Sequence, residues 1–151
     1  MAILEVGINL GTRNLIEIKY YKSSDHILDP DLRAGFLSAL ESFTNEVFGD
    51  DINVVSLASF KLVCYCELVA LPSDDPTNKQ PLLAYAITEK ETETEIIKKH
   101  LATIHSHFLN RYSLNDIFSK KGKFFNNFEK RIDEILGDLK LKIEDRFRSI
   151  F

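Results

Sequence analysis

No segment of the 151-residue sequence is apolar over the roughly 20 residues needed to cross a membrane. The longest apolar runs, Ile52–Phe60 and Pro81–Thr88, have the length of β-strands. The N-terminal residues also lack the basic and then apolar segments of a signal peptide. We therefore predict neither a membrane-spanning nor a secreted protein, but a cytoplasmic one that is at most peripheral to a membrane.

Cysteine is scarce, with only Cys64 and Cys66. In a β-strand, two residues at this spacing share a face about 7 Å apart, which is too far for a disulfide. A Cys-x-Cys pair can supply half of a metal site, but the sequence has no second pair to complete one. The simplest interpretation is two small buried side chains, and no metal or cofactor is predicted.

The sequence has no excess of basic residues: 19 Lys and Arg against 23 Asp and Glu give a net charge of −4. This excludes a strongly basic nucleic-acid-binding protein on bulk charge. The charge is unevenly distributed, because residues 1–95 contain 7 basic and 16 acidic residues, whereas residues 96–151 contain 12 and 7. The sequence therefore predicts a molecule with one acidic and one basic side.

Motifs of common catalytic and nucleotide-binding sites are absent: there is no GxxxxGK[ST], GxGxxG, HExxH or GxSxG pattern. His100, His105 and His107 fall in one predicted helix, but their separations of 5, 2 and 7 residues do not match a helical metal pair. We interpret them as surface or boundary residues. No enzyme activity and no catalytic residue is predicted.

Apolar patterns and turn signals define the order of the elements. Ile3–Tyr21 alternates on either side of a turn, which predicts a β-hairpin. Asp29-Pro30 is a helix-start signal, and Gly49 ends a run with apolar residues every three or four positions. The later predicted elements are strands Ile52–Leu57, Phe60–Leu71 and Leu82–Ile87, then helices Ile96–Tyr112 and Phe125–Leu139.

The resulting order, β-β-α-β-β-β-α-α, predicts an α+β fold with a five-stranded antiparallel sheet. The first, fourth and fifth strands are apolar on both sides, which predicts inner strands that are covered on both faces. We expect the helix Asp29–Phe48 on one face and the two later helices on the other. No linker separates two cores, so one domain is predicted over residues 1–139, with a helical extension at 140–151.

With this order, the chain resembles the longin domain family, which has a profilin-like five-stranded antiparallel sheet. In that family one helix lies between the second and third strands, and two helices follow the fifth. The segments that carry the resemblance are Ile3–Tyr21, Gly35–Phe43, Leu82–Ile87 and Ile96–Tyr112. Too few residues follow Leu139 for a SNARE coiled coil, so the resemblance favours a stand-alone longin-like protein. The Ile- and Lys-rich composition suits an archaeal member.

The resemblance implies a non-enzymatic adaptor subunit in small-GTPase regulation or vesicle-mediated membrane trafficking. Its expected partner is itself, another longin- or roadblock-type subunit, or a small GTPase. Longin-like domains often bind partners in the groove between the first helix and the third strand. This groove maps onto Phe43, Val47, Ile52, Val54 and Leu57. For Phe43 and Val47, simple core packing is the competing interpretation.

Basic residues of the C-terminal part form a second candidate surface. They are Lys98, Lys99, Lys120, Lys121 and Lys123. These lysines can contact an acidic protein or an acidic membrane surface, or merely solvate a turn. Neighbouring aromatic residues also occur in single-strand nucleic-acid sites, which we favour less. For the whole chain, a small-ligand sensor domain with a five-stranded sheet and an enzyme of unknown type are the alternatives to an adaptor.

Overall fold

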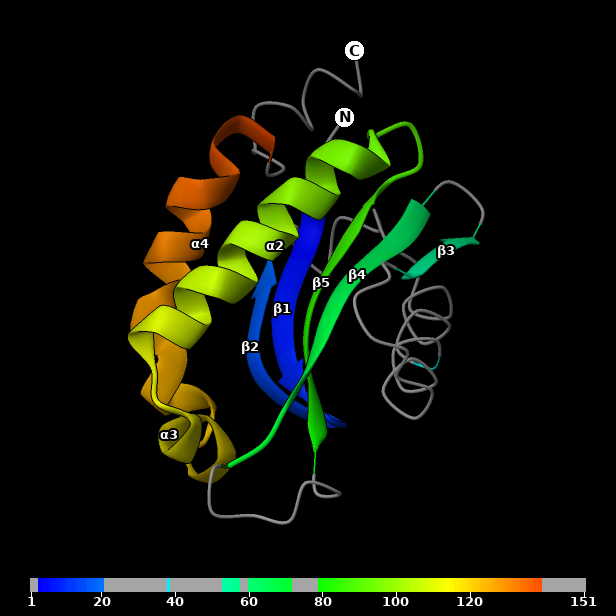
Figure 1. The fold of residues 1–151 in the computed structure, drawn as a ribbon. Helices are drawn as coiled ribbons and strands as arrows, with labels where there is room; N and C mark the ends of the chain where they lie inside the picture. Colours follow the sequence, from blue (N-terminus) through cyan, green and yellow to red (C-terminus); the bar gives the residue numbers. More distant parts are fainter. Residues whose placement is uncertain (1–2, 21–37, 39–52, 58–59, 72–78, 140–151) are drawn as a thin grey trace.

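The computed structural model describes residues 3–20, 38, 53–57, 60–71 and 79–139. The predicted helix Asp29–Phe48, apart from Ser38, lies outside these residues, and so does the predicted extension at 140–151. The described residues form a sheet and the helices that follow it (Figure 1).

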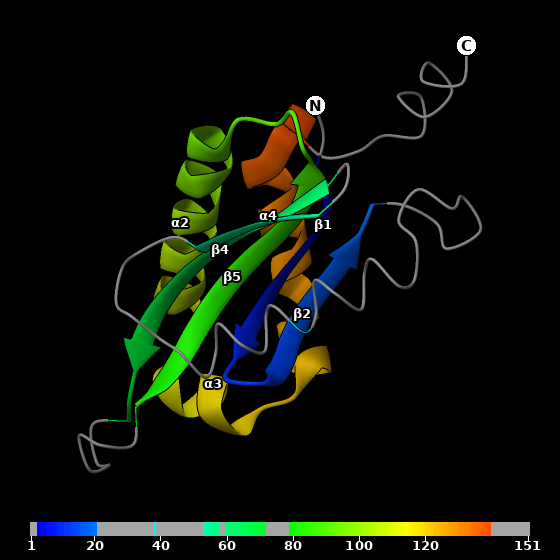
Figure 2. The same cartoon turned by 90° about the vertical axis from the view of Figure 1, so that its right-hand side faces the viewer.

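The described strands form one antiparallel sheet (Figures 1 and 2). They are β1 (Ile3–Leu10), β2 (Arg13–Lys19), β3 (Asn53–Leu57), β4 (Phe60–Val69) and β5 (Gln80–Glu89). Their order across the sheet is β2-β1-β5-β4-β3, with every neighbouring pair antiparallel. The predicted α+β class is confirmed, and β1, β4 and β5 are the inner strands, as predicted.

β1 and β2 form the predicted hairpin. Gly11 has a φ of 59°, a left-handed conformation that glycine adopts without strain, in the two-residue turn between the strands. Its N–H donates to the Pro81 carbonyl at 2.8 Å, which ties the turn to β5. Val6 pairs with Ile18 across the hairpin, so apolar side chains of both strands share a face.

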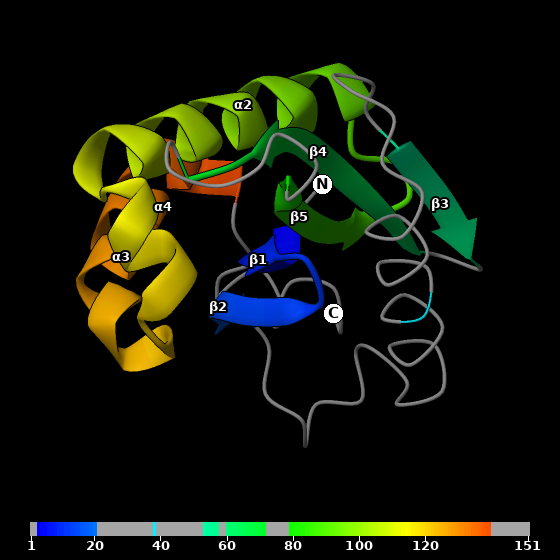
Figure 3. The ribbon, with the colours of Figure 1, turned by 60° about the horizontal axis from the view of Figure 1, so that its bottom comes forward.

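The helices follow β5 and begin with α2 (Thr94–Arg111). The others are α3 (Leu114–Ser119), the 3₁₀-helix η2 (Gly122–Phe128), α4 (Glu129–Leu136) and the 3₁₀-helix η3 (Gly137–Leu139). α2 and α4 lie side by side on one face of the sheet, and α3 and η2 connect them at one end (Figures 1 and 3). This confirms that the predicted C-terminal pair of helices shares a face.

The predicted single helix Phe125–Leu139 is wrong at both ends: α4 ends at Leu136, and Gly137–Leu139 form a 3₁₀-helix. Residues up to Phe128 form a 3₁₀-helix, and the α-helix begins at Glu129. A 3₁₀-helix places residues three apart on the same side. Phe125 and Phe128 have this spacing and are both fully buried, so the same apolar pattern fits the tighter helix.

α2 packs on the sheet through one apolar stripe. Its buried members are Ile97, Leu101, Ile104 and Phe108, three or four residues apart. The β5 residues in the same core, Ala84 and Ala86, are small, which allows close packing of the helix on the strand. The predicted helix Ile96–Tyr112 is thus confirmed, with bounds that differ by one or two residues.

The opposite face of the sheet is buried as well. Side chains alternate along a strand, so the neighbours of Ala84 and Ala86 in β5 face away from α2. The buried residues of β4 and β5 on this second face are Leu62, Cys64, Cys66, Leu83, Tyr85 and Ile87. The inner strands are therefore covered on both faces, as their apolar sequences predict.

Candidate interaction surfaces

β3 forms one edge of the described sheet (Figure 2). It pairs with β4 over its whole length, and no other described strand lies on its outer side. The opposite edge, β2, is partly covered: the Arg13 guanidinium donates to the carbonyls of Ile117 and Phe118 at 2.7 and 3.0 Å. Among the described elements, β3 is thus the uncovered edge of the sheet.

Only two of the predicted protein-binding residues fall in the described part of the chain. Val54 and Leu57 lie in β3, opposite Val63 and Phe60 of β4. Phe43, Val47 and Ile52 lie outside the described residues. The groove between the first helix and the third strand therefore stays a prediction, whereas the edge position of β3 is observed.

The structure divides the predicted basic surface into two clusters. Lys98 and Lys99 are exposed in the first half of α2. Lys120, Lys121 and Lys123 are exposed between the end of α3 and the start of η2. α2 rises about 18 Å from Lys99 to its last residue, so the two clusters do not form one small binding site.

An exposed aromatic ring lies beside Lys120 of the second lysine cluster. Phe124 is 44% exposed, and the Lys120 ammonium lies 5.6 Å from the centroid of its ring. The ring rests on the buried Phe125, with their centroids 5.2 Å apart. An exposed ring among lysines suits an acidic partner or an acidic lipid surface, since the cations attract it and the ring contributes apolar contact.

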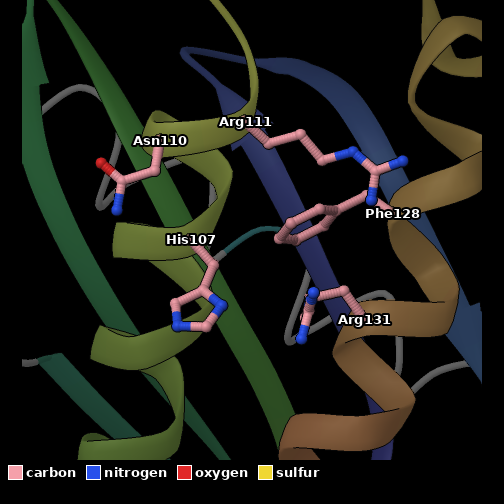
Figure 4. Close-up of a pocket in the computed structure, with 5 residues that line it drawn as sticks. All are labelled: His107, Asn110, Arg111, Phe128 and Arg131. Atoms are coloured by element: carbon pink, nitrogen blue, oxygen red, sulfur yellow. The ribbon is translucent and has the colours of Figure 1, made fainter.

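An open cleft of about 320 Å³ lies between α2 and α4 (Figure 4). Its lining residues are His107, Asn110, Arg111, Phe128 and Arg131. None of them was predicted as a site residue. The spacing of four between His107 and Arg111 was visible in the sequence, but Arg131 follows Arg111 by 20 residues. Only the packing of α4 against α2 brings the two arginines to one cleft.

His105 is a buried residue, contrary to the predicted surface or boundary position. It is 2% exposed, and its Nε2 lies 2.9 Å from the Leu82 carbonyl oxygen. Nδ1 lies 3.5 Å from Glu67 Oε2, and the ring packs edge-on against Tyr65. Burial lowers the pKa of His105, although the Leu82 carbonyl and the Glu67 carboxylate oppose this shift. The sequence pattern missed it because its partners come from two strands.

Because of His105, the free energy of unfolding should decrease as the pH is lowered below about 6.5. Its pKa is lowered in the folded state, so the unfolded chain takes up a proton first as the pH decreases, and unfolding is favoured. One residue changes the free energy of unfolding by at most about 1.4 kcal/mol per pH unit. This contribution stops once the pH is below the pKa of His105 in the folded state.

Urea unfolding from about pH 7.5 to about pH 5 measures this slope. His105→Gln keeps a donor for the Leu82 carbonyl and should flatten the dependence, whereas His107→Gln, at an exposed position of the same helix, should not. Equal slopes in wild type and His105→Gln would show that other groups cause the pH dependence.

Two other buried polar residues were not indicated by the sequence. Lys61 in β4 is 6% exposed; its ammonium donates to the Thr92 carbonyl and, at 2.9 Å, to Thr94 Oγ1. It thereby ties β4 to the segment that begins α2. Glu5 in β1 is fully buried and accepts a hydrogen bond from the Tyr85 hydroxyl at 3.0 Å. Both interactions have a structural role in the core.

The cysteines are free and buried, as predicted. Burial raises the pKa of the Cys64 thiol, and it raises that of Cys66 to about 11 with a smaller contribution from Glu67. Both thiols are therefore protonated near neutral pH, which disfavours nucleophilic chemistry. Among the described residues, no cluster of His, Cys, Asp and Glu could hold a metal ion.

Comparison with models of known protein families gives no match, and comparison with curated proteins gives no significant match. Within the described residues, no helix is both long and apolar enough to cross a bilayer.

Proposed function

We propose that this chain is a stand-alone longin-like adaptor, a non-enzymatic module that pairs with itself or with another small α/β subunit through the β3 edge. In that assembly it acts in small-GTPase regulation or membrane trafficking, as the longin resemblance implies. The observation that carries the proposal is the position of β3, whose outer hydrogen-bonding groups are not used by any described strand. Such an edge can accept a strand from a partner.

The strand order supports a longin-like fold. A hairpin, β1–β2, and a three-stranded meander, β3–β4–β5, join through the pairing of β1 with β5. Two α-helical segments, α2 and α4, then lie on the same face of the sheet. This agrees with a family layout in which two helices follow the fifth strand.

The lysine cluster with Phe124 supports a contact with an acidic surface. It lies at the end of the molecule where α3 and η2 connect α2 to α4, away from β3 (Figure 3). A partner strand at β3 and an acidic protein or membrane at this cluster can therefore be bound at the same time. Such a two-sided arrangement is useful to an adaptor.

The β3 edge can be tested because its outward N–H groups can be identified. Leu57 pairs with Phe60 across a two-residue connection, and a pair at this position of a hairpin exchanges both backbone hydrogen bonds. Because bonded and non-bonded pairs alternate, the N–H groups of Val54 and Ser56 point away from β4. Proline at these positions removes a donor from the outer edge while leaving the β4 pairing intact.

We expect Val54→Pro to weaken pairing of the chain about tenfold or more, since it removes a backbone donor and places a ring on the edge. Size-exclusion chromatography with light scattering measures self-association. Capture of purified small GTPases from the source organism measures pairing with that class of partner. The melting temperature of Val54→Pro should stay within a few degrees of wild type.

Val55→Pro is the matched control, because the N–H of this residue points toward β4 by the same alternation. It should lower the melting temperature, since it removes a hydrogen bond within the sheet. A folded Val54→Pro with unchanged partner binding would reject the β3 edge as the interface. A wild-type chain that neither self-associates nor binds a small GTPase or second α/β subunit would contradict the adaptor function.

A further inference from the structure

The cleft between α2 and α4 gathers three basic side chains from two helices. His107 and Arg111 lie four residues apart and so on one side of α2, and Arg131 is in α4. Figure 4 shows Arg111 extending toward α4 and Arg131 extending toward α2, with the ring of Phe128 between them. Each arginine therefore crosses the gap between the two helices, and both side chains line the same cleft.

The positive charge of the cleft is only partly compensated within the described residues. Arg131 Nη1 lies 3.3 Å from Glu134 Oε2, but both side chains are at least half exposed, so this ion pair is weak. Arg111 has no ion pair with a described residue; its guanidinium lies 5.7 Å from the centroid of the Tyr112 ring. Donors of both arginines remain for an anionic ligand.

The base of the cleft is held in place by aromatic packing. Phe128 is fully buried, and its ring centroid lies 5.2 Å from that of Phe108 and 6.1 Å from that of Tyr112. These contacts connect η2, immediately before α4, to α2. The backbone positions from which the arginines extend are thus fixed before a ligand binds, which lowers the entropy cost of binding.

We propose that this cleft binds a phosphate group. The guanidinium fork matches the geometry of phosphate oxygens, and the forks of Arg111 and Arg131 with the His107 imidazole can supply donors to a phosphate dianion. A volume of about 320 Å³ fits a small phosphorylated molecule or the head group of a phosphorylated lipid. The cleft lies away from β3 (Figures 1 and 3), so this site does not depend on the proposed edge pairing.

Titration with inorganic phosphate at constant ionic strength, followed by NMR shifts of backbone amides, tests the site. The largest shifts should fall on residues 107–111 and 128–131, with one saturable binding constant. Arg111→Gln and Arg131→Gln should each weaken binding about tenfold or more, because each removes charge-assisted hydrogen bonds. Glu134→Gln should strengthen binding about two- to threefold, because it frees Arg131.

Lys90→Gln is the matched control, since it removes the same charge from an exposed position in the turn before α2, at the other end of this helix from the cleft. It should leave phosphate binding unchanged. Equal weakening by Lys90→Gln and Arg111→Gln would indicate non-specific attraction and overturn the proposal. Thermal unfolding of each variant confirms that it is folded.

Vesicles distinguish the two sources of the phosphate group. Phosphatidylcholine vesicles with phosphatidylinositol 4-phosphate should bind wild type and not Arg111→Gln if a lipid head group is the ligand. Binding of inorganic phosphate without vesicle binding indicates a free phosphorylated molecule. Binding to neither probe would overturn the site, and it would leave the β3 edge and its proline test unaffected.

Discussion

Replacing Phe108 with alanine is expected to lower the free energy of unfolding by about 3–5 kcal/mol. Phe108 is fully buried, and its ring centroid lies 5.0 Å from that of Tyr112, 5.3 Å from that of Phe125 and 5.2 Å from that of Phe128. The change removes apolar contacts and leaves a cavity where α2, η2 and α4 meet, which the surrounding backbone can fill only in part. Urea unfolding followed by circular dichroism measures the loss.

Phe124→Ala is the matched control in the same aromatic cluster. Phe124 is 44% exposed and touches the cluster only through Tyr112 and Phe125, so its loss should cost less than about 1.5 kcal/mol. Similar losses for the two variants would contradict the central position of Phe108. The same cluster holds the helices that carry Arg111 and Arg131, so a loosened cluster should also weaken phosphate binding.

The sheet could be predicted from the sequence because its signals are local. Strands that alternate or are apolar on both sides, and turn residues such as Gly11, mark where each strand begins and ends. The apolar character of β1, β4 and β5 also indicated the inner positions, since only a strand covered on both faces can bury both sides.

The division of the C-terminal helices was only partly predictable. Apolar residues three apart fit a 3₁₀-helix as well as an α-helix, so the sequence did not separate Phe125–Phe128 from α4.

Buried polar groups were missed for a different reason. His105, Lys61 and Glu5 are satisfied by partners from other elements, and the sequence of one element does not contain those partners.

The candidate sites also differ in how far the sequence could predict them, because some depend on neighbouring residues and others on the packing of separate elements. The uneven charge along the chain indicated a basic C-terminal part, and Lys120 and its neighbours are exposed there. The sequence did not indicate the cleft, because its arginines lie on separate helices. The three predicted inner strands left β2 and β3 as the edges, but only the structure shows that Arg13 of β2 contacts the segment after α2.

Replacing Gly7 with alanine is expected to lower the free energy of unfolding by about 3 kcal/mol or more. A Cβ atom at this position would lie 2.5 Å from Tyr85 Cε1 and 2.6 Å from the Ile16 carbonyl oxygen. The Tyr85 ring is buried and held by its hydrogen bond to Glu5, and the carbonyl belongs to the backbone of β2. Neither neighbour can move without disturbing the pairing of β1, so the strain falls on the centre of the sheet.

Gly122→Ala provides the control for a glycine substitution with a less close contact. Its Cβ would lie 3.3 Å from the Leu15 carbonyl oxygen, and Gly122 does not have the positive φ of Gly11, so the change should cost less than about 1 kcal/mol. Tyr85→Leu added to Gly7→Ala should restore only part of the loss, because the carbonyl contact remains. A Gly7→Ala protein as stable as wild type would contradict the pairing of Gly7 with Tyr85, and with it the position of β1 beside β5.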